Sequence, residues 1–133
     1  MPVGKRILIV DDSTAMTAIV SRTLKDAGYG YIDCVHNGGG ALAALRQKKY
    51  DLVITNWQMQ PISGIELTKL IRADSDLSKI RIIIITGQGQ ENEAWLSGAD
   101  GFLEQPFEPR ALTEKVEDVL STVALLGDEV GTT

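Results

Sequence analysis

The sequence predicts an α/β domain in which the five strands of a doubly wound parallel sheet alternate with five helices. Short runs of apolar and β-branched residues, typical of strands buried on both faces, recur five times along the chain. Between these runs, apolar residues recur at helical spacing. Alternation of this kind predicts a parallel sheet with right-handed crossovers. Polar residues that follow such strands lie at the carboxyl edge of the sheet, where open α/β folds place their chemistry.

The first strand is predicted at Lys5–Val10, and the acidic pair Asp11–Asp12 follows it directly. Ser13 or Thr14 can cap the helix that comes next, because a side-chain oxygen at that position accepts a bond from a free amide of the first turn. Gly28 ends this helix, as glycine often does.

The second strand is predicted at Tyr31–His36, and the dipeptide Asn37–Gly38 is typical of a turn. The apolar residues of Ala41–Leu45 mark a second helix. We expect that helix to begin loosely, because Gly39–Gly40 occupies its first turn and glycine lowers helix stability.

The third strand is the apolar run Leu52–Ile54, which stops at Thr55 and Asn56. Met59–Pro61 forms a loop, and the helical pattern that follows covers Gly64–Ala73. Asn56 therefore occupies the position at which a reactive group is expected in this fold class.

The fourth strand is predicted at Arg81–Thr86, which contains four consecutive isoleucines. A short helix around Glu93–Ser97 and a strand at Phe102–Glu104 follow. Pro109 begins the last helix, since proline is favoured in the first helical turn.

Length and composition bound the function. The chain of 133 residues is predicted to form one domain, residues 1–123, with residues 124–133 as a flexible tail. A net charge of -5 and the lack of a basic cluster argue against nucleic acid, and no apolar run approaches the ~20 residues that span a bilayer. With Cys34 as its single cysteine, the chain is expected to be reduced and cytoplasmic.

Ile9–Asp12 after the first strand, Thr86 after the fourth and Gln105–Phe107 after the fifth together resemble a response-regulator receiver domain of the CheY-like family. The resemblance covers residues 4–123 and implies a flavodoxin-like sheet with strand order 2-1-3-4-5. Receivers of this family accept a phosphoryl group from a histidine kinase on an aspartate at the end of the third strand. A divalent ion screens the incoming charge, and a lysine contacts the phosphoryl oxygens.

The resemblance assigns the positions of this site residue by residue. They are the ion ligands Asp11, Asp12 and the backbone carbonyl of Gln58, the switch residues Thr86 and Phe102, the acceptor position Asn56, and the lysine position Gln105.

Two of these positions depart from the family pattern. An acyl phosphate needs a carboxylate nucleophile, and the amide of Asn56 has no ionised oxygen. Gln105 removes the cation that would neutralise a phosphoryl group. With Asp11 and Asp12 the four positions still sum to a charge of -2, as in a working receiver. We expect the amides of Asn56 and Gln105 to hydrogen-bond to each other.

Other side chains near the site have simpler interpretations. Thr55 is a poor substitute acceptor, because strand alternation aims it away from the side chain of Asn56. We expect Thr86 to cap the loop after the fourth strand. His36 is interpreted as a strand-end residue far from the site. Trp95 is expected to pack into the core with one edge exposed.

The sequence therefore predicts a pseudo-receiver, a two-component-type signalling protein that binds a partner without phosphorylation. It is not expected to be an enzyme, and it requires no cofactor beyond a weak Mg²⁺ or Ca²⁺ site at Asp11 and Asp12. The partner, a histidine kinase or a downstream signalling protein, is expected on the face of helix 4, strand 5 and helix 5. This face includes Trp95, Phe102 and Gln105. Helix 4 is expected to be about one turn shorter than in relatives, which changes the shape of the face.

Two alternatives stay open. The chain is an inactive or engineered variant of an ordinary phosphorylatable chemotaxis-type receiver, or it is a flavin-binding redox domain, since flavodoxins share this topology. The acidic loop from Asp11 to Thr14 disfavours the second alternative, because it would repel a flavin phosphate.

Overall fold

The computed structural model of the chain describes residues 4–87, 89 and 91–132, with the side chains of Glu91 and of residues 122–132 outside the description. Five parallel strands form one sheet in the order β2-β1-β3-β4-β5, which confirms the predicted fold class and strand order. The strands are β1 Arg6–Val10, β2 Tyr31–Val35, β3 Leu52–Asn56, β4 Arg81–Thr86 and β5 Gly101–Glu104. The helices are α1 Thr14–Asp26, α2 Gly38–Gln47, α3 Gly64–Ala73, α4 Glu91–Leu96 and α5 Pro109–Thr132.

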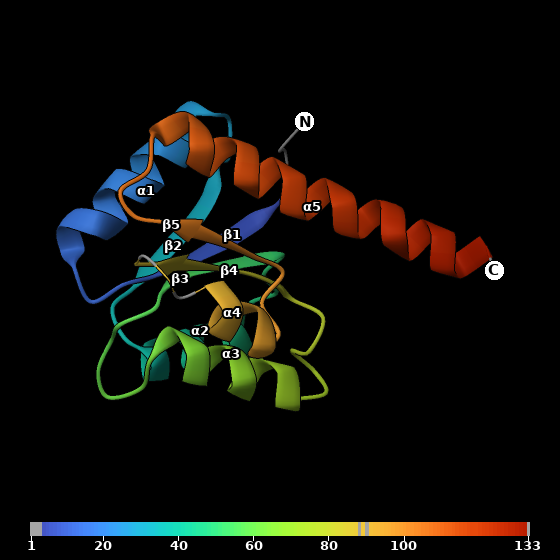
Figure 1. Cartoon of the computed structure of the whole chain (residues 1–133), viewed down its shortest axis with the longest axis horizontal. Coiled ribbons are helices and arrows are strands. Elements are labelled where there is room, and N and C mark those ends of the chain that lie inside the picture. The colour runs from blue at the N-terminus through green and yellow to red at the C-terminus, as the bar shows by residue number, and fades with distance from the viewer. Residues whose placement is uncertain (1–3, 88, 90, 133) are drawn as a thin grey trace.

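Helices cover both faces of the sheet (Figure 1). α1 and α5 lie on one face, and α2, α3 and α4 lie on the other. Successive side chains of each strand alternate between the two cores, as the period of a strand requires. In β4, for example, Ile82 and Ile84 pack on the side of α3, whereas Ile83 and Ile85 pack on the side of α5. Burial on both faces explains why the strands read as continuous apolar runs.

Polar caps set where the helices begin. Ser13 is the N-cap of α1, and its Oγ accepts a bond of 3.1 Å from the amide of Met16. The turn predicted at Asn37–Gly38 is wrong, because Asn37 instead caps α2 and its Oδ1 accepts a bond of 2.7 Å from the amide of Gly40. A capping box between Ser63 and Glu66, which the sequence reading missed, begins α3.

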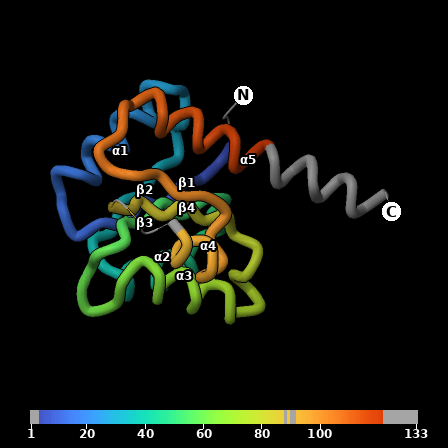
Figure 2. Tube along the Cα trace, in the orientation of Figure 1, coloured from blue at the N-terminus to red at the C-terminus, as the bar shows by residue number. Residues whose placement is uncertain are grey.

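The later boundaries follow the expected order with small shifts. α4 has six residues and begins at Glu91, two residues before the predicted start, and β5 begins at Gly101. The backbone of α5 spans Pro109–Thr132. Figure 2 shows the coloured part of α5 on the same side of the sheet as α1. The flexible tail expected at residues 124–133 falls where side chains are not described, so its flexibility stays a prediction. Among the described residues, no helix has both the length and the apolar composition needed to span a bilayer.

The guanidinium group of Arg72 connects α3 to the segment before β4 and to the segment after α4. It donates to the carbonyls of Gly98 at 2.8 Å, Ser78 at 2.9 Å and Ile80 at 2.6 Å, and to Oδ2 of Asp100 at 2.7 Å. The same Asp100 oxygen also accepts the amide of Ile82, which begins the buried part of β4. Because each carbonyl has a charged donor, these bonds are stronger than ordinary ones and hold the end of α4 in place.

A second polar cluster lies at the amino end of the strands. Oδ2 of Asp33 accepts the hydroxyl of Tyr50 at 2.6 Å and Nζ of Lys48 at 3.3 Å. The Tyr50 bond is the largest cause that lowers the pKa of Asp33, and burial and this bond raise the pKa of Tyr50 to about 12. The amide of Arg6 donates to Oδ2 of Asp51 at 2.8 Å. These bonds anchor the segments that lead into β1 and β3.

Replacing Tyr50 by phenylalanine is expected to destabilise the fold in a pH-dependent way. In the folded state the pKa of Asp33 lies below its ordinary value of 3.8. The contribution of ionised Asp33 to the free energy of unfolding is therefore present above pH 3.8 and is lost as the pH falls through the folded pKa. Tyr50→Phe should therefore lower the free energy of unfolding by about 1 kcal/mol at pH 7. The loss should be smaller below pH 3.8.

Urea unfolding of both proteins at the two pH values measures this difference. Tyr31→Phe is the matched control, because Tyr31 is half exposed and its hydroxyl group makes none of these bonds. An equal loss for Tyr50→Phe at both pH values would contradict the role assigned to the hydroxyl.

Candidate functional site

Polar residues that end or follow four of the strands lie together at the carboxyl edge of the sheet. Asp11 and Asp12 follow β1, and Gln105 follows β5. The register places Asn56 opposite Ile85, and Thr86 opposite Glu104, so the ends of β3, β4 and β5 are level. The predicted site residues are therefore brought to one edge, as parallel strands require.

The side chain of Asn56 is half-buried at the end of β3, and its amide group has a definite partner. Its Nδ2 donates to the backbone carbonyl of Gln58 at 3.0 Å. The resemblance assigns this same carbonyl to a divalent ion. An ionised carboxylate has only acceptor oxygens and could not make this bond. The local structure is thus one that an asparagine can form and an ionised aspartate cannot.

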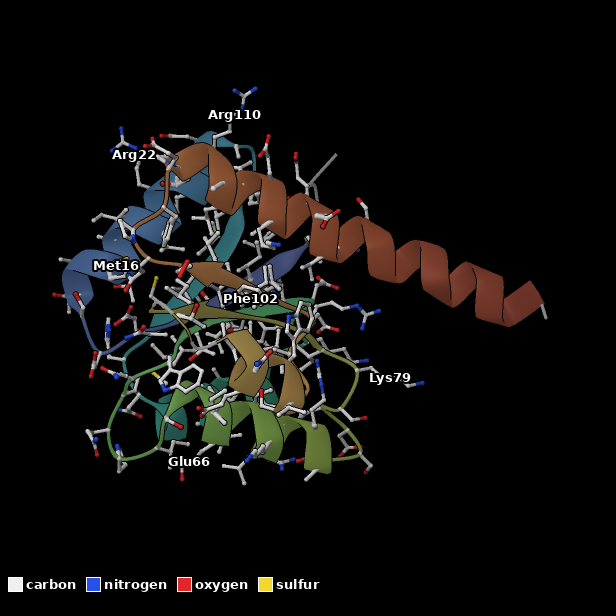
Figure 3. All side chains as sticks on the ribbon, in the orientation of Figure 1. Met16, Arg22, Glu66, Lys79, Phe102 and Arg110 are labelled. Atoms are coloured by element: carbon white, nitrogen blue, oxygen red, sulfur yellow. The ribbon has the colours of Figure 1, made fainter. Side chains whose placement is uncertain are left out.

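Gln105 does not reach Asn56, so the predicted bond between the two amides is wrong. Its Nε2 lies 4.0 Å from Sδ of Met16 on α1, and its backbone amide donates to the carbonyl of Thr86 at 2.8 Å. Met16 lies on the edge of α1 that faces the end of β5 (Figure 3). Each side chain has a different partner, Gln58 for Asn56 and Met16 for Gln105.

The two acidic residues differ strongly in environment. Asp11 is only 3% exposed, and its Oδ1 accepts a bond of 2.9 Å from the amide of Ser13. Burial raises the pKa of Asp11 above its ordinary value, and the charge of Asp12 raises it further, against the Ser13 bond. Asp12 is exposed and borders a hollow of about 450 Å³. The other residues that line this hollow are Trp57, Gln58, Met59, Gln60 and Ser63.

These residues fit a tightly held divalent ion poorly in this arrangement. Ions such as Mg²⁺ take carboxylate and carbonyl oxygens as ligands. Here the Gln58 carbonyl already accepts the Asn56 amide, and Asp11 is buried with one oxygen bound by Ser13. Among the described residues, no group of three or more His, Cys, Asp or Glu side chains could hold a metal ion.

The two threonines at this edge are both buried. Thr55 is 0% exposed, and its hydroxyl group donates toward the Asn56 carbonyl at 3.1 Å and toward Sδ of Met59 at 3.9 Å. Thr86 is 1% exposed, and its hydroxyl oxygen has no hydrogen-bond partner among the described residues. The expectation that Thr86 caps the loop after β4 is therefore wrong. Neither hydroxyl group is accessible enough to replace an acceptor.

His36 is a neighbour of the site that the sequence reading placed too far away. Its Nδ1 lies 3.1 Å from the backbone carbonyl of Asp11, and the charge of His36 lowers the pKa of the Asp11 carboxyl. The amide of Asp11 also donates to the carbonyl of Val35 at 3.2 Å. The strand order 2-1-3-4-5 contained the signal, because it makes β2 the direct neighbour of β1.

The helix α4 and the strand β5 carry an aromatic pair. The rings of Trp95 and Phe102 meet edge to face, with centroids 5.4 Å apart, and Nζ of Lys115 on α5 lies 6.0 Å from the Phe102 centroid. Trp95 is 50% exposed, which is more than the core anchor expected from the sequence, and Leu96 is 85% exposed. Exposed tryptophan and leucine side chains that adjoin each other are typical of a surface that binds a partner.

Comparisons with known proteins agree with this architecture. A family model of the response regulator receiver domain matches residues 7–117. Chemotaxis protein CheY-3 of Vibrio cholerae is 35% identical over 86% of this chain and 90% of its own length. Chemotaxis protein CheY of Pseudomonas aeruginosa is 31% identical over 89% of this chain and 98% of its own length.

Solved structures lead to the same family. Chemotaxis response regulator CheY4 of Vibrio cholerae has a TM-score of 0.81 and 31% identity, covering 86% of this chain and 98% of its own. The signal receiver domain of a histidine kinase from Syntrophus aciditrophicus has a TM-score of 0.83 and 28% identity, covering 90% of this chain and 92% of its own. The chain therefore belongs to the response-regulator receiver family of two-component signalling. Within it, the chain is CheY-like, similar to chemotaxis proteins.

Asn56→Asp is expected to strengthen Mg²⁺ binding by about tenfold or more. The substitution adds a carboxylate ligand and removes the donor that now bonds to the Gln58 carbonyl. The chain has two tryptophans. In a Trp95→Phe background, the fluorescence of Trp57, which borders the hollow, measures the titration.

Asn56→Ala is the matched control, since it frees the Gln58 carbonyl without adding a charge. Its Mg²⁺ affinity should stay close to that of the parent protein. A parent protein that binds Mg²⁺ as tightly as the Asn56→Asp variant would refute this interpretation of the ligand set.

Proposed function

We propose that this receiver acts as a protein-interaction module that works without phosphorylation on an aspartate. The observation that carries the proposal is the bond from the amide of Asn56 to the carbonyl of Gln58 at the end of β3. A carboxamide in this place cannot attack a phosphoryl donor, because its nitrogen lone pair is delocalised and its oxygen is not ionised.

The surroundings of Asn56 support the same conclusion. Gln105 brings no cation to the edge, and its amide points toward Met16. Stabilisation of the charge on the transferred group is most of what a phosphoryl-transfer site contributes. The hydroxyl groups of Thr55 and Thr86 are buried, so neither offers a substitute nucleophile.

The partner surface in this proposal is the face formed by α4, β5 and α5. Trp95 and Phe102 supply exposed aromatic area, and Gln105 borders it at the carboxyl edge. The partner is a histidine kinase or a downstream signalling protein in the cytoplasm. The role needs neither a cofactor nor nucleic acid or a membrane. Cys34 is a free thiol, as the reducing cytoplasm allows.

The direct test is incubation with acetyl phosphate and Mg²⁺, followed by intact-mass spectrometry. The wild-type chain is expected to keep its mass, because Asn56 offers no nucleophilic oxygen. Asn56→Asp combined with Gln105→Lys should gain one phosphoryl group, which proves that the donor is competent. A stable gain of one phosphoryl group on the wild-type chain would rule the proposal out.

The alternative is an inactive or engineered variant of an ordinary chemotaxis-type receiver. Its supporting observation is that Asp11, Asp12 and Thr86 all lie at the carboxyl edge beside Asn56. Asn56→Asp alone separates the two ideas. Efficient phosphorylation of this single variant by a kinase would favour the alternative, whereas a requirement for Gln105→Lys as well would favour the pseudo-receiver.

Trp95→Ala is expected to weaken partner binding about tenfold or more, because exposed tryptophans at interface centres contribute strongly to affinity. Immobilised protein is mixed with extract of the source cell, and the captured protein is quantified by mass spectrometry. Ile19→Ala is the matched control, since Ile19 is 55% exposed but lies on α1. Equal capture by the wild-type chain and Trp95→Ala would refute the assignment of this face.

A further inference from the structure

The edge of the sheet opposite the candidate site carries two adjoining grooves. One has a volume of about 560 Å³ and lies between the end of α2 and the loop before β4. The other, of about 300 Å³, continues past the starts of β1, β3 and β4 to Leu120 on α5. Tyr50, Asp76 and Ile80 line both, so the two form one continuous surface, here called the amino-edge groove.

The amino-edge groove is basic in an acidic protein. Its lining includes six of the thirteen basic residues of the chain, namely Lys5, Arg46, Lys48, Lys49, Lys79 and Arg81. Its only acidic lining residues are Asp51 and Asp76, and two of its cations are paired with the neighbouring carboxylates of Asp33 and Asp74, which leaves a local charge of +2 on a chain of net charge -5. Separation of charge on this scale attracts an anionic partner and repels a basic one.

Four of these cations have no ion pair among the described residues. Arg46 pairs with Asp74 and Lys48 with Asp33, whereas no such pair is formed by Lys5, Lys49, Lys79 and Arg81. All three lysines are exposed, and Lys79 projects from the body of the molecule on the side away from Met16 (Figure 3). The three ammonium groups can thus bind external carboxylates without breaking an internal pair.

The floor of the groove is apolar. Leu45, Tyr50 and Leu77 are 4%, 7% and 6% exposed, and Ile80 and Leu120 are half-buried along it. A small inorganic anion would use only the lysines of the rim. A peptide with acidic and apolar side chains in alternation would use both the rim and the floor, which is the arrangement of polar rim and apolar centre common in protein interfaces.

We propose that the amino-edge groove docks an acidic protein segment whose carboxylates pair with Lys49 and Lys79 and whose apolar side chains cover Leu77 and Ile80. This surface lies at the opposite end of the strands from Asn56 and goes beyond the proposed function. It would let one receiver bind two proteins at once, one at each end of the sheet.

The test uses a fluorescein-labelled peptide of alternating glutamate and leucine and fluorescence anisotropy with the full chain. The peptide should bind, and the affinity should fall as salt is raised. The variant K49E plus K79E should bind roughly tenfold more weakly. K25E plus K69E changes the net charge equally at exposed lysines outside the groove and should bind within about twofold of the wild-type chain.

Several results would overturn the proposal. One is equal peptide affinity for the wild-type chain and for K49E plus K79E. Another is that inorganic phosphate displaces the labelled peptide at the same concentration as unlabelled peptide does. Loss of self-association in K49E plus K79E, measured by sedimentation, would assign the groove to a second copy of the chain instead.

Amide chemical shifts keep this test separate from that of the proposed function. Peptide-induced shifts are expected at residues 48–51 and 79–81. Shifts at residues 95–102 instead would assign the peptide to the face of α4 and β5 and overturn the amino-edge proposal, while leaving the pseudo-receiver proposal standing. Thermal unfolding of both double variants verifies that they are folded.

Discussion

Burial of the sheet on both faces is the constraint on which the rest of the structure depends. Ile83 and Ile84 in β4 face opposite cores and are both fully buried, so neither face of the sheet can hold a solvated polar site. Polar groups that need water or a partner must therefore lie where the strands begin or end. The carboxyl ends carry Asn56 and Asp12, and the amino ends carry the lysine-lined groove.

The fold could be predicted because strands buried on both faces appear in the sequence as short apolar runs. The strands of the sheet emerged from apolar runs alone, and the family resemblance supplied their order. The wrong predictions concern hydrogen-bond partners, which the local sequence pattern does not specify. The dipeptide Asn37–Gly38 is typical of a turn, but α2 begins at Gly38 and Asn37 caps it. The bond expected between Asn56 and Gln105 is wrong, because Asn56 bonds to the backbone of Gln58 and Gln105 contacts Met16.

The candidate site was predictable in its membership but not in its electrostatics. Asp11 and Asp12 look alike in sequence, yet one is 3% exposed and the other is exposed, because the Asp11 amide extends the pairing with β2. His36 joins the site through that same pairing. Burial raises the pKa of Asp11, and burial depends on the packing of helices that the local sequence does not specify.

The proposed role also needs a partner face that does not depend on chemistry at the carboxyl edge. Arg72 meets this need, since its bonds to Gly98, Ile80 and Asp100 fix the end of α4 from the amino-end side of the sheet. Thr86, by contrast, buries a hydroxyl group that has no hydrogen-bond partner among the described residues, and an unpaired buried hydroxyl group costs about 1–3 kcal/mol. In the proposed function no phosphoryl group stabilises a moved Thr86, so only a protein that binds two conformations of the α4–β5 face unequally can change their populations.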